Sequence, residues 1–270
     1  MRRSKNNNKK ITIKNIIKKK GRQKITCLTC YSKSVAEILD KHCDIILVGD
    51  SLGMVLYGFK STKKVTIDTM ILHAKSVKQG VKKSLVVVDM PFKTYSNKII
   101  AYKNAKKIIR STKCDAVKLE GGRSIVKTIK YLVKKGIPVM GHIGLLPQYA
   151  GTFKVQGKNN FQSKKIINDA LAISKSGAFA VVIECVVENL ARHITNIIAI
   201  PTIGIGASQY CDGQVLVTDD MIGLSSFYPK FVKRYSKVRN VIKKSVIKYC
   251  NDVKNKKFPS KKNTYNFLNR

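Results

Sequence analysis

The chain has 270 residues with 53 Lys and Arg against 15 Asp and Glu, which gives a formal net charge of +38 at pH 7. Hydrophobic residues make up 44% of the sequence, so the composition excludes a disordered chain or a collagen-like repeat. The apolar runs 45–48 and 85–88 are strand-sized, well short of the roughly 18 residues of a membrane-spanning helix. The basic N-terminus shows no secretory signal, so we expect a cytoplasmic protein without a membrane partner.

Short runs of β-branched residues alternate with longer stretches of helical periodicity, which is typical of repeated βα units around a parallel sheet. The predicted strands are 25–29, 45–48, 85–89, 116–120, 138–141, 178–184, 201–205 and 214–217. The predicted helices between them are 34–41, 68–80, 97–111, 124–135, 163–176 and 188–196. The connection between the last two strands is too short for a full helix, and residues 230–254 are expected to form a further helical segment.

Eight parallel strands with this spacing predict an α/β fold, a (β/α)8 TIM-type barrel with a C-terminal helical extension. An open doubly wound sheet is the alternative. We expect a basic N-terminal segment over 1–23, one barrel domain over 24–254 that includes the C-terminal helix, and a basic tail over 255–270.

Two features of the composition have an ordinary explanation. The odd number of cysteines, 7, and their scattered positions predict reduced thiols. Cys27 and Cys30 form a CxxC pair, but an odd separation along a strand sends the two side chains to opposite faces. Basic residues occur along the whole chain without an aromatic stacking platform, so we expect a solvated surface and no specific nucleic-acid partner.

Acidic side chains, which are scarce in this chain, occur at the carboxyl ends of several predicted strands. Asp50 follows the second strand, and Asp89, Glu120 and Glu184 end the third, fourth and sixth. His142 comes directly after the fifth. Barrel enzymes place their active sites at this end of the strands. Any one of these acids is equally explained as a helix N-cap or loop residue, but a common site explains all four better.

The predicted strand 116–120 gives the most specific indication of a functional site. Alternation along a strand places Val117 and Leu119 on one face and Lys118 and Glu120 on the other. With the apolar pair facing the helices, Lys118 and Glu120 point into the barrel mouth, where burial is costly unless the charges are paired or bound. Three carboxylates converging from adjacent strands suit magnesium better than zinc.

Nine segments of the chain closely resemble the ketopantoate hydroxymethyltransferase family, in order and spacing from about residue 24 to 259. They are KITCLTCY (24–31), VGDSLGM (48–54), TKKVTIDTM (62–70), VDMPF (88–92), VKLEGG (117–122), GIPVMGHIGLLPQ (136–148), KVQGK (154–158), IPTIGIGAS (200–208) and CDGQVLV (211–217). The loop between 148 and 154 is a few residues shorter than in familiar members.

The resemblance implies a magnesium-dependent barrel that transfers a hydroxymethyl group from 5,10-methylenetetrahydrofolate to 3-methyl-2-oxobutanoate, giving ketopantoate for pantothenate and coenzyme A. It also implies a homo-oligomer, commonly a decamer. Matched position by position, Asp50 and Asp89 are expected to bind magnesium, with Glu120 at the third ligand position. The expected keto-acid contacts are Asp50, Ser51, Asp89 and Lys118.

The chemistry implied by the resemblance gives each remaining residue a role. Magnesium bound to the keto oxygen and carboxylate stabilises the developing enolate as a Lewis acid, and Lys118 adds positive charge. Glu184, at the family's general-base position, is expected to remove the C3 proton. His142 either contacts substrate, orients a carboxylate or has only a structural role.

Two other functions compete with this interpretation. One is another magnesium-dependent keto-acid enzyme of the phosphoenolpyruvate mutase and isocitrate lyase type, although the catalytic-loop cysteine motif of that group is not visible here. The other is a basic RNA-binding protein, which predicts affinity that collapses with added salt. The enzyme hypothesis predicts instead activity that a chelator abolishes.

Overall fold

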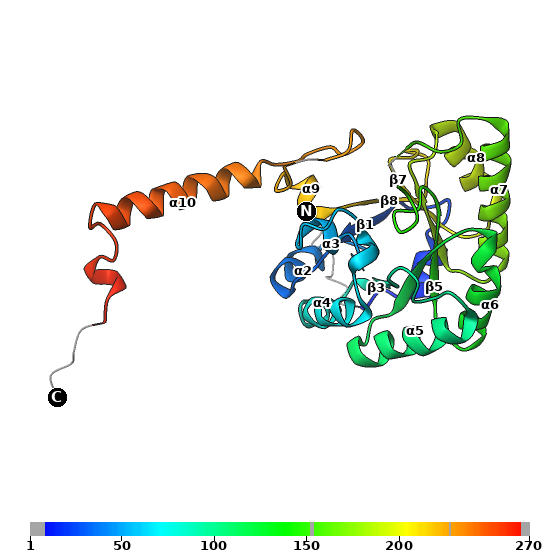
Figure 1. Ribbon diagram of the computed structural model, residues 1–270, viewed down its shortest axis with the longest axis horizontal. Coiled ribbons are helices and arrows are strands. Elements are labelled where there is room, and N and C mark those ends of the chain that lie inside the picture. The colour runs from blue at the N-terminus through cyan, green and yellow to red at the C-terminus, as the bar shows by residue number, and fades with distance from the viewer. Residues whose placement is uncertain (1–8, 152–153, 227, 266–270) are drawn as a thin grey trace, which may run out of the picture. The chain divides into compact units, whose positions relative to one another are not determined.

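The computed structural model describes residues 9–151, 154–226 and 228–265 (Figure 1). Parts of the predicted N-terminal segment, of the loop 148–154 and of the C-terminal tail lie outside the described residues. Contacts divide the chain into two compact units, Met1–Thr218 and Asp219–Arg270. Each unit is described by itself.

The first unit is a closed barrel of eight parallel strands in sequence order, which confirms the predicted fold. The strands are β1 (Ile25–Thr29), β2 (Ile45–Val48), β3 (Leu85–Asp89), β4 (Ala116–Glu120), β5 (Val139–Gly144), β6 (Ala180–Glu184), β7 (Thr202–Ile205) and β8 (Gly213–Leu216). The predicted end of the fifth strand was wrong, because β5 keeps pairing with β6 as far as Gly144 and Glu184. His142 therefore lies inside β5 and not after it.

Helices cover the outside of the barrel (Figure 1). They are α2 (Lys33–Leu39), α4 (Ile67–Gly80), α5 (Lys98–Thr112), α6 (Val126–Lys134), α7 (Asn160–Lys175) and α8 (Glu188–Ile197). The short helices α1 (Ile13–Lys18) and α3 (Leu52–Val55) were not predicted. Residues 206–212 join β7 to β8 without a helix, as expected from the length of the connection.

Alternation along the strands produces two apolar clusters, one between strands and helices and one inside the barrel. Val117 and Leu119 belong to the outer cluster, as the pattern of β4 predicted. Cys27 lies in the inner cluster and Cys30 in the outer one, so the two side chains of the CxxC pair lie on opposite faces, as the odd separation predicted. Ile16 of α1 is fully buried against the inner cluster.

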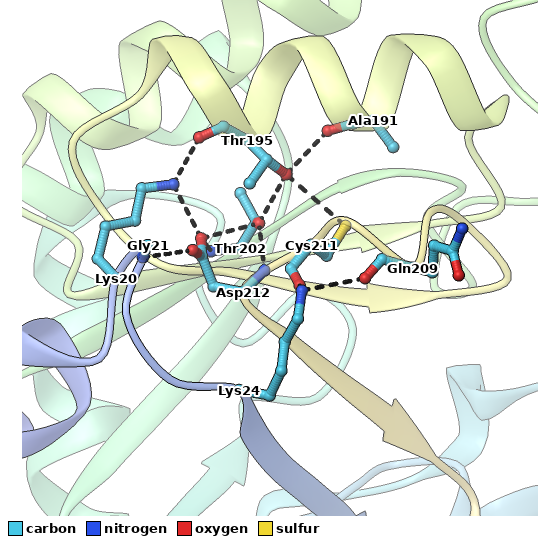
Figure 2. A network of polar contacts seen from close by, with 9 residues as sticks. All are labelled: Lys20, Gly21, Lys24, Ala191, Thr195, Thr202, Gln209, Cys211 and Asp212. Atoms are coloured by element: carbon cyan, nitrogen blue, oxygen red, sulfur yellow. Dashed lines mark hydrogen bonds and ion pairs between the residues drawn. The ribbon is translucent and has the colours of Figure 1, made fainter.

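A polar network at the amino ends of the strands joins the first and last parts of the barrel (Figure 2). The Asp212 carboxylate accepts hydrogen bonds from Lys20 Nζ at 2.8 Å, Gly21 N at 2.9 Å and Thr202 N at 2.9 Å. Burial raises the pKa of Asp212, but these donors outweigh burial and hold the pKa below its usual value. Asp212 thus anchors the segment before β1 to the β7–β8 connection.

The second unit contains α10 (Val238–Lys254) and the short 3-10 turn Lys261–Asn263. The prediction of one domain over 24–254 stays a prediction, and by contacts alone α10 is grouped with residues 219–270. The reason is that α10 buries none of its side chains. No helix in the described ranges is long and apolar enough to cross a membrane.

Candidate active site

The structure brings the predicted polar side chains together at the carboxyl ends of the strands. Five of them come from four different strands or the turns that follow: Asp50, Asp89, Lys118, Glu120 and His142. Each of these five is at most 5% exposed. Glu184, at the end of β6, is more accessible, with 13% of its side chain exposed. The parallel register sets this arrangement, since it places Asp89 beside Lys118 and Glu120 beside His142.

Lys118 is a buried cation of the site. Its Nζ lies 2.8 Å from Asp89 Oδ1, and the side chains are 5% and 4% exposed. Asp89 Oδ1 has no hydrogen bond of good geometry, so the pair is held chiefly by charge. Burial lowers the pKa of Lys118, but the charges of Asp89, Glu120 and Asp50 raise it above its ordinary value. Lys118 is therefore protonated at neutral pH.

Asp50 is a buried carboxyl group beside two others. Burial, and then the charges of Asp89 and Glu120, raise its pKa well above the usual value. Its backbone N–H donates to Asp89 Oδ2 at 3.2 Å, which fixes the spacing of the two residues. The neighbouring Ser51 has its Oγ 2.8 Å from the hydroxyl of Tyr31. The excess of negative charge at Asp50 would favour a bound cation.

His142 lies between two carboxylates. Its Nδ1 is 3.5 Å from Glu120 Oε1 and its Nε2 is 3.2 Å from Glu184 Oε2. Burial lowers the pKa of His142, but its interactions with Glu120 and Glu184 raise the pKa to about 9. For Glu120 the two effects have the opposite sign. Burial raises the pKa of Glu120, but the His142 imidazolium and Lys118 outweigh burial and lower that pKa below its usual value. Neither ring nitrogen makes a hydrogen bond of good geometry within the described part of the chain, so the ring contacts the two carboxylates chiefly by charge.

Gln148 is a site residue that sequence reasoning missed. It lies in the loop after β5, is 1% exposed, and donates from Nε2 to Asp50 Oδ2 at 2.8 Å and to the carbonyl of Met90 at 2.9 Å. Its backbone N–H donates to Glu120 Oε2 at 3.0 Å, and its Oε1 accepts from Tyr95. No periodic pattern marks an amide in a loop, so the only sequence signal was its place at the end of the segment 136–148.

The donor set fits a hard divalent cation. Asp50, Asp89 and Glu120 offer carboxylate oxygens, and Asp89 Oδ1, which lies beside the Lys118 ammonium, is buried without a hydrogen bond of good geometry. No group of three or more His, Cys, Asp or Glu side chains among the described residues is already arranged to hold a metal ion. Magnesium usually takes one or two protein carboxylates and fills its other positions with water and substrate. Asp50 and Asp89 satisfy that requirement.

Solved structures with the same barrel belong to distant proteins. A 2,3-dimethylmalate lyase of the PEP mutase/isocitrate lyase superfamily is 12% identical, with a TM-score of 0.59 over 94% of this chain and 86% of that one. A phosphonopyruvate hydrolase in complex with oxalate and Mg²⁺ is 11% identical, with a TM-score of 0.59 over 93% of this chain and 92% of the other. At these identities the likeness shows the fold alone.

Curated relatives are much closer in sequence. The 3-methyl-2-oxobutanoate hydroxymethyltransferase of Pelagibacter ubique is 57% identical over 258 residues, which span 96% of this chain and all of the relative. The enzyme of the same name from Rhizobium etli is 53% identical over 95% of this chain and 96% of its own length. The sequence profile of ketopantoate hydroxymethyltransferase matches residues 10–261. The chain belongs to the ketopantoate hydroxymethyltransferase family.

Proposed function

We propose that the protein transfers a hydroxymethyl group from 5,10-methylenetetrahydrofolate to 3-methyl-2-oxobutanoate, with uptake of water, to give 2-dehydropantoate and tetrahydrofolate. The names of the relatives support the keto acid as acceptor. The observation that carries the proposal is the Lys118–Asp89 pair, 2.8 Å long and buried next to Asp50. A buried lysine among carboxylates suits an anionic keto acid that arrives together with a divalent cation.

Asp50 and Asp89 would hold magnesium, with Glu120 as third ligand, directly or through water. When bound, the cation supplies positive charge at the keto group and makes the neighbouring C3 proton more acidic. Lys118 Nζ, 2.8 Å from Asp89, adds a fixed positive charge on the same side of the site. Ser51, held by Tyr31 at 2.8 Å, offers a hydroxyl to the keto acid.

Glu184 would remove the C3 proton as general base. It is the most exposed carboxylate of the group, so it can reach a substrate from the barrel mouth. The His142 ring, 3.2 Å from Glu184 Oε2, keeps that carboxylate turned toward the site. The carbon from which the proton leaves would then form a bond with the methylene carbon of the folate, while the bond from that carbon to one folate nitrogen breaks. Water would displace the second nitrogen from the same carbon and supply the hydroxyl group. The two nitrogens take up the proton removed from C3 and the remaining proton of the water, which gives 2-dehydropantoate and tetrahydrofolate.

The other proposed properties follow the family. We infer that the protein works in the cytoplasm as a homo-oligomer, with the decamer as the expected state and without a specific nucleic-acid partner. The alternative, an enzyme of the mutase and lyase type, is not favoured. The sequence identity to those proteins is 11–12%, whereas the identity to the hydroxymethyltransferase of Pelagibacter ubique is 57%.

The test is the formation of 2-dehydropantoate from the two substrates in the presence of Mg²⁺ or EDTA. Wild-type protein is compared with Asp89→Asn and Glu184→Gln. We expect magnesium-dependent product that both substitutions reduce by at least 100-fold, on the order of general acid–base contributions. A folded wild-type protein that makes no product with Mg²⁺ would overturn the proposal.

A further inference from the structure

We infer that Gln148 is a positioning residue for the metal site: its side-chain amide fixes Asp50 while its backbone N–H fixes Glu120. The inference rests on the proposed function, because it takes Asp50 and Glu120 as magnesium ligands. Gln148 lies in the loop after β5, which contains neither of these acids, and its neutral side-chain amide hydrogen-bonds to Asp50. It acts through the two carboxylates and not on the substrate.

The surroundings of Gln148 determine which way its amide points. The Met90 carbonyl can only accept a hydrogen bond, so the atom 2.9 Å from it must be the amide nitrogen. The same nitrogen lies 2.8 Å from Asp50 Oδ2, which also accepts. The amide oxygen then faces the hydroxyl of Tyr95, which donates to it. Each polar atom of the amide thus has a partner of the right kind.

Burial makes this orientation costly to lose. Gln148 is 1% exposed and Tyr95 is 2% exposed, so water cannot readily replace a missing partner. An unpaired buried donor or acceptor costs about 1–3 kcal/mol, and a flipped amide would leave several of them. The amide therefore keeps one orientation, and Asp50 Oδ2 keeps one position. A carboxylate with one oxygen fixed presents its other oxygen in a defined direction.

The main chain of Gln148 acts on a different ligand. Its N–H donates to Glu120 Oε2 at 3.0 Å, while the other carboxylate oxygen of Glu120 lies 3.5 Å from His142 Nδ1. One loop residue thus links Asp50, which follows β2, to Glu120, at the end of β4. Ligating carboxylates that are themselves hydrogen-bonded bind metal better, and loss of such a partner typically weakens affinity by about 10–100-fold.

Manganese binding to the full-length protein without substrate, followed by electron paramagnetic resonance, tests the inference. Gln148→Met keeps the side-chain volume and the backbone N–H but removes the amide. We expect a dissociation constant for Mn²⁺ about 10-fold higher or more. Gln148→Leu, which also removes the amide and keeps the backbone N–H, is expected to raise the constant by a similar factor, whereas Tyr95→Phe would also remove the contacts of the Tyr95 hydroxyl with the Glu120 backbone N–H and carbonyl. Gln23→Met, at an exposed glutamine at the opposite end of the barrel, is the matched control and should leave the constant unchanged.

The outcomes separate the inference from the proposed function. Weaker Mn²⁺ binding by a folded Gln148→Met protein or, if that variant does not fold, by a folded Gln148→Leu protein supports the positioning role, while Gln23→Met keeps the wild-type constant. Wild-type affinity in a folded Gln148→Met protein overturns it and leaves the metal site intact. A wild-type protein that binds no Mn²⁺ overturns the metal assignment together with this inference.

Discussion

The substitution Lys118→Met removes the buried cation that pairs with Asp89 and keeps most of the side-chain volume. At 2.8 Å and an effective dielectric constant of about 20, the attraction within this pair is about 6 kcal/mol. Desolvation of both groups offsets part of that attraction. Removal of one partner of a buried pair nevertheless costs about 3–5 kcal/mol, because the other charge is left buried without compensation.

This loss should appear in the metal-free protein as a lower midpoint of thermal unfolding. For a unit of this size, about 3–5 kcal/mol corresponds to a decrease of roughly 6–20 °C. The pKa of Lys118 is raised in the folded protein. Its contribution is therefore complete below the unfolded value of about 10.4, and is lost as the pH rises through the higher folded pKa. Calorimetry in EDTA at pH 8 therefore measures the full contribution of Lys118 to the free energy of unfolding.

Lys107→Met provides the matched control. Lys107 pairs with Asp68 at 2.6 Å, but the two side chains are 52% and 77% exposed. An exposed pair contributes about 0–1 kcal/mol, so the midpoint should change by a few degrees at most. Equal shifts for the two variants, or a loss under about 1 kcal/mol for Lys118→Met, would refute the argument that burial makes the Lys118–Asp89 pair important.

Three further outcomes are expected. Magnesium at 100 times its dissociation constant should raise the free energy of unfolding by about 2.7 kcal/mol, and Asp89→Asn should remove most of that gain in thermal melts. Gly122→Ala should cost about 1–3 kcal/mol in urea denaturation, because an added Cβ would lie 2.0 Å from Asp169 Cγ. Gly151→Ala, with open space around it, is the control and should change little. Asp212→Asn should cost about 2 kcal/mol at pH 7. That cost should shrink below pH 4, since the lowered pKa makes the contribution of Asp212 complete above the unfolded value of about 3.9 and lost as the pH falls through the folded one. A cost that is the same at pH 3 and pH 7 would contradict this account.

The sequence predicted the barrel well because its strands are apolar runs of the right length at regular intervals. β1 to β4 begin and end at the predicted residues. The end of β5 was misplaced because Gly141, His142 and Gly144 resemble a turn, whereas the pairing with β6 continues through them. The helix α1 was missed although Ile13, Ile16 and Ile17 have helical spacing, because six residues are fewer than the roughly 11–18 over which a helical period is recognised.

The acids of the site could be predicted because each ends or follows a strand, and parallel register then places them at one end of the barrel. Alternation in β4 correctly separated Lys118 and Glu120 from their apolar neighbours. Gln148 could not be found this way. Its contacts depend on the loop after β5 meeting Asp50 after β2 and Met90 after β3, and such a meeting is a property of the folded chain with no local pattern.

Closure of the barrel has a consequence for the time at which the protein can fold during synthesis. β1 pairs with β8, and Gly21 binds Asp212, a partner 191 residues further along the chain. At about 5–20 residues per second, the ribosome needs roughly 10–40 seconds to add that partner. Until then one edge of β1 has no strand beside it, and an exposed strand edge can pair with another chain. The edge of β1 in the nascent chain is therefore open to pairing with other chains until β8 emerges.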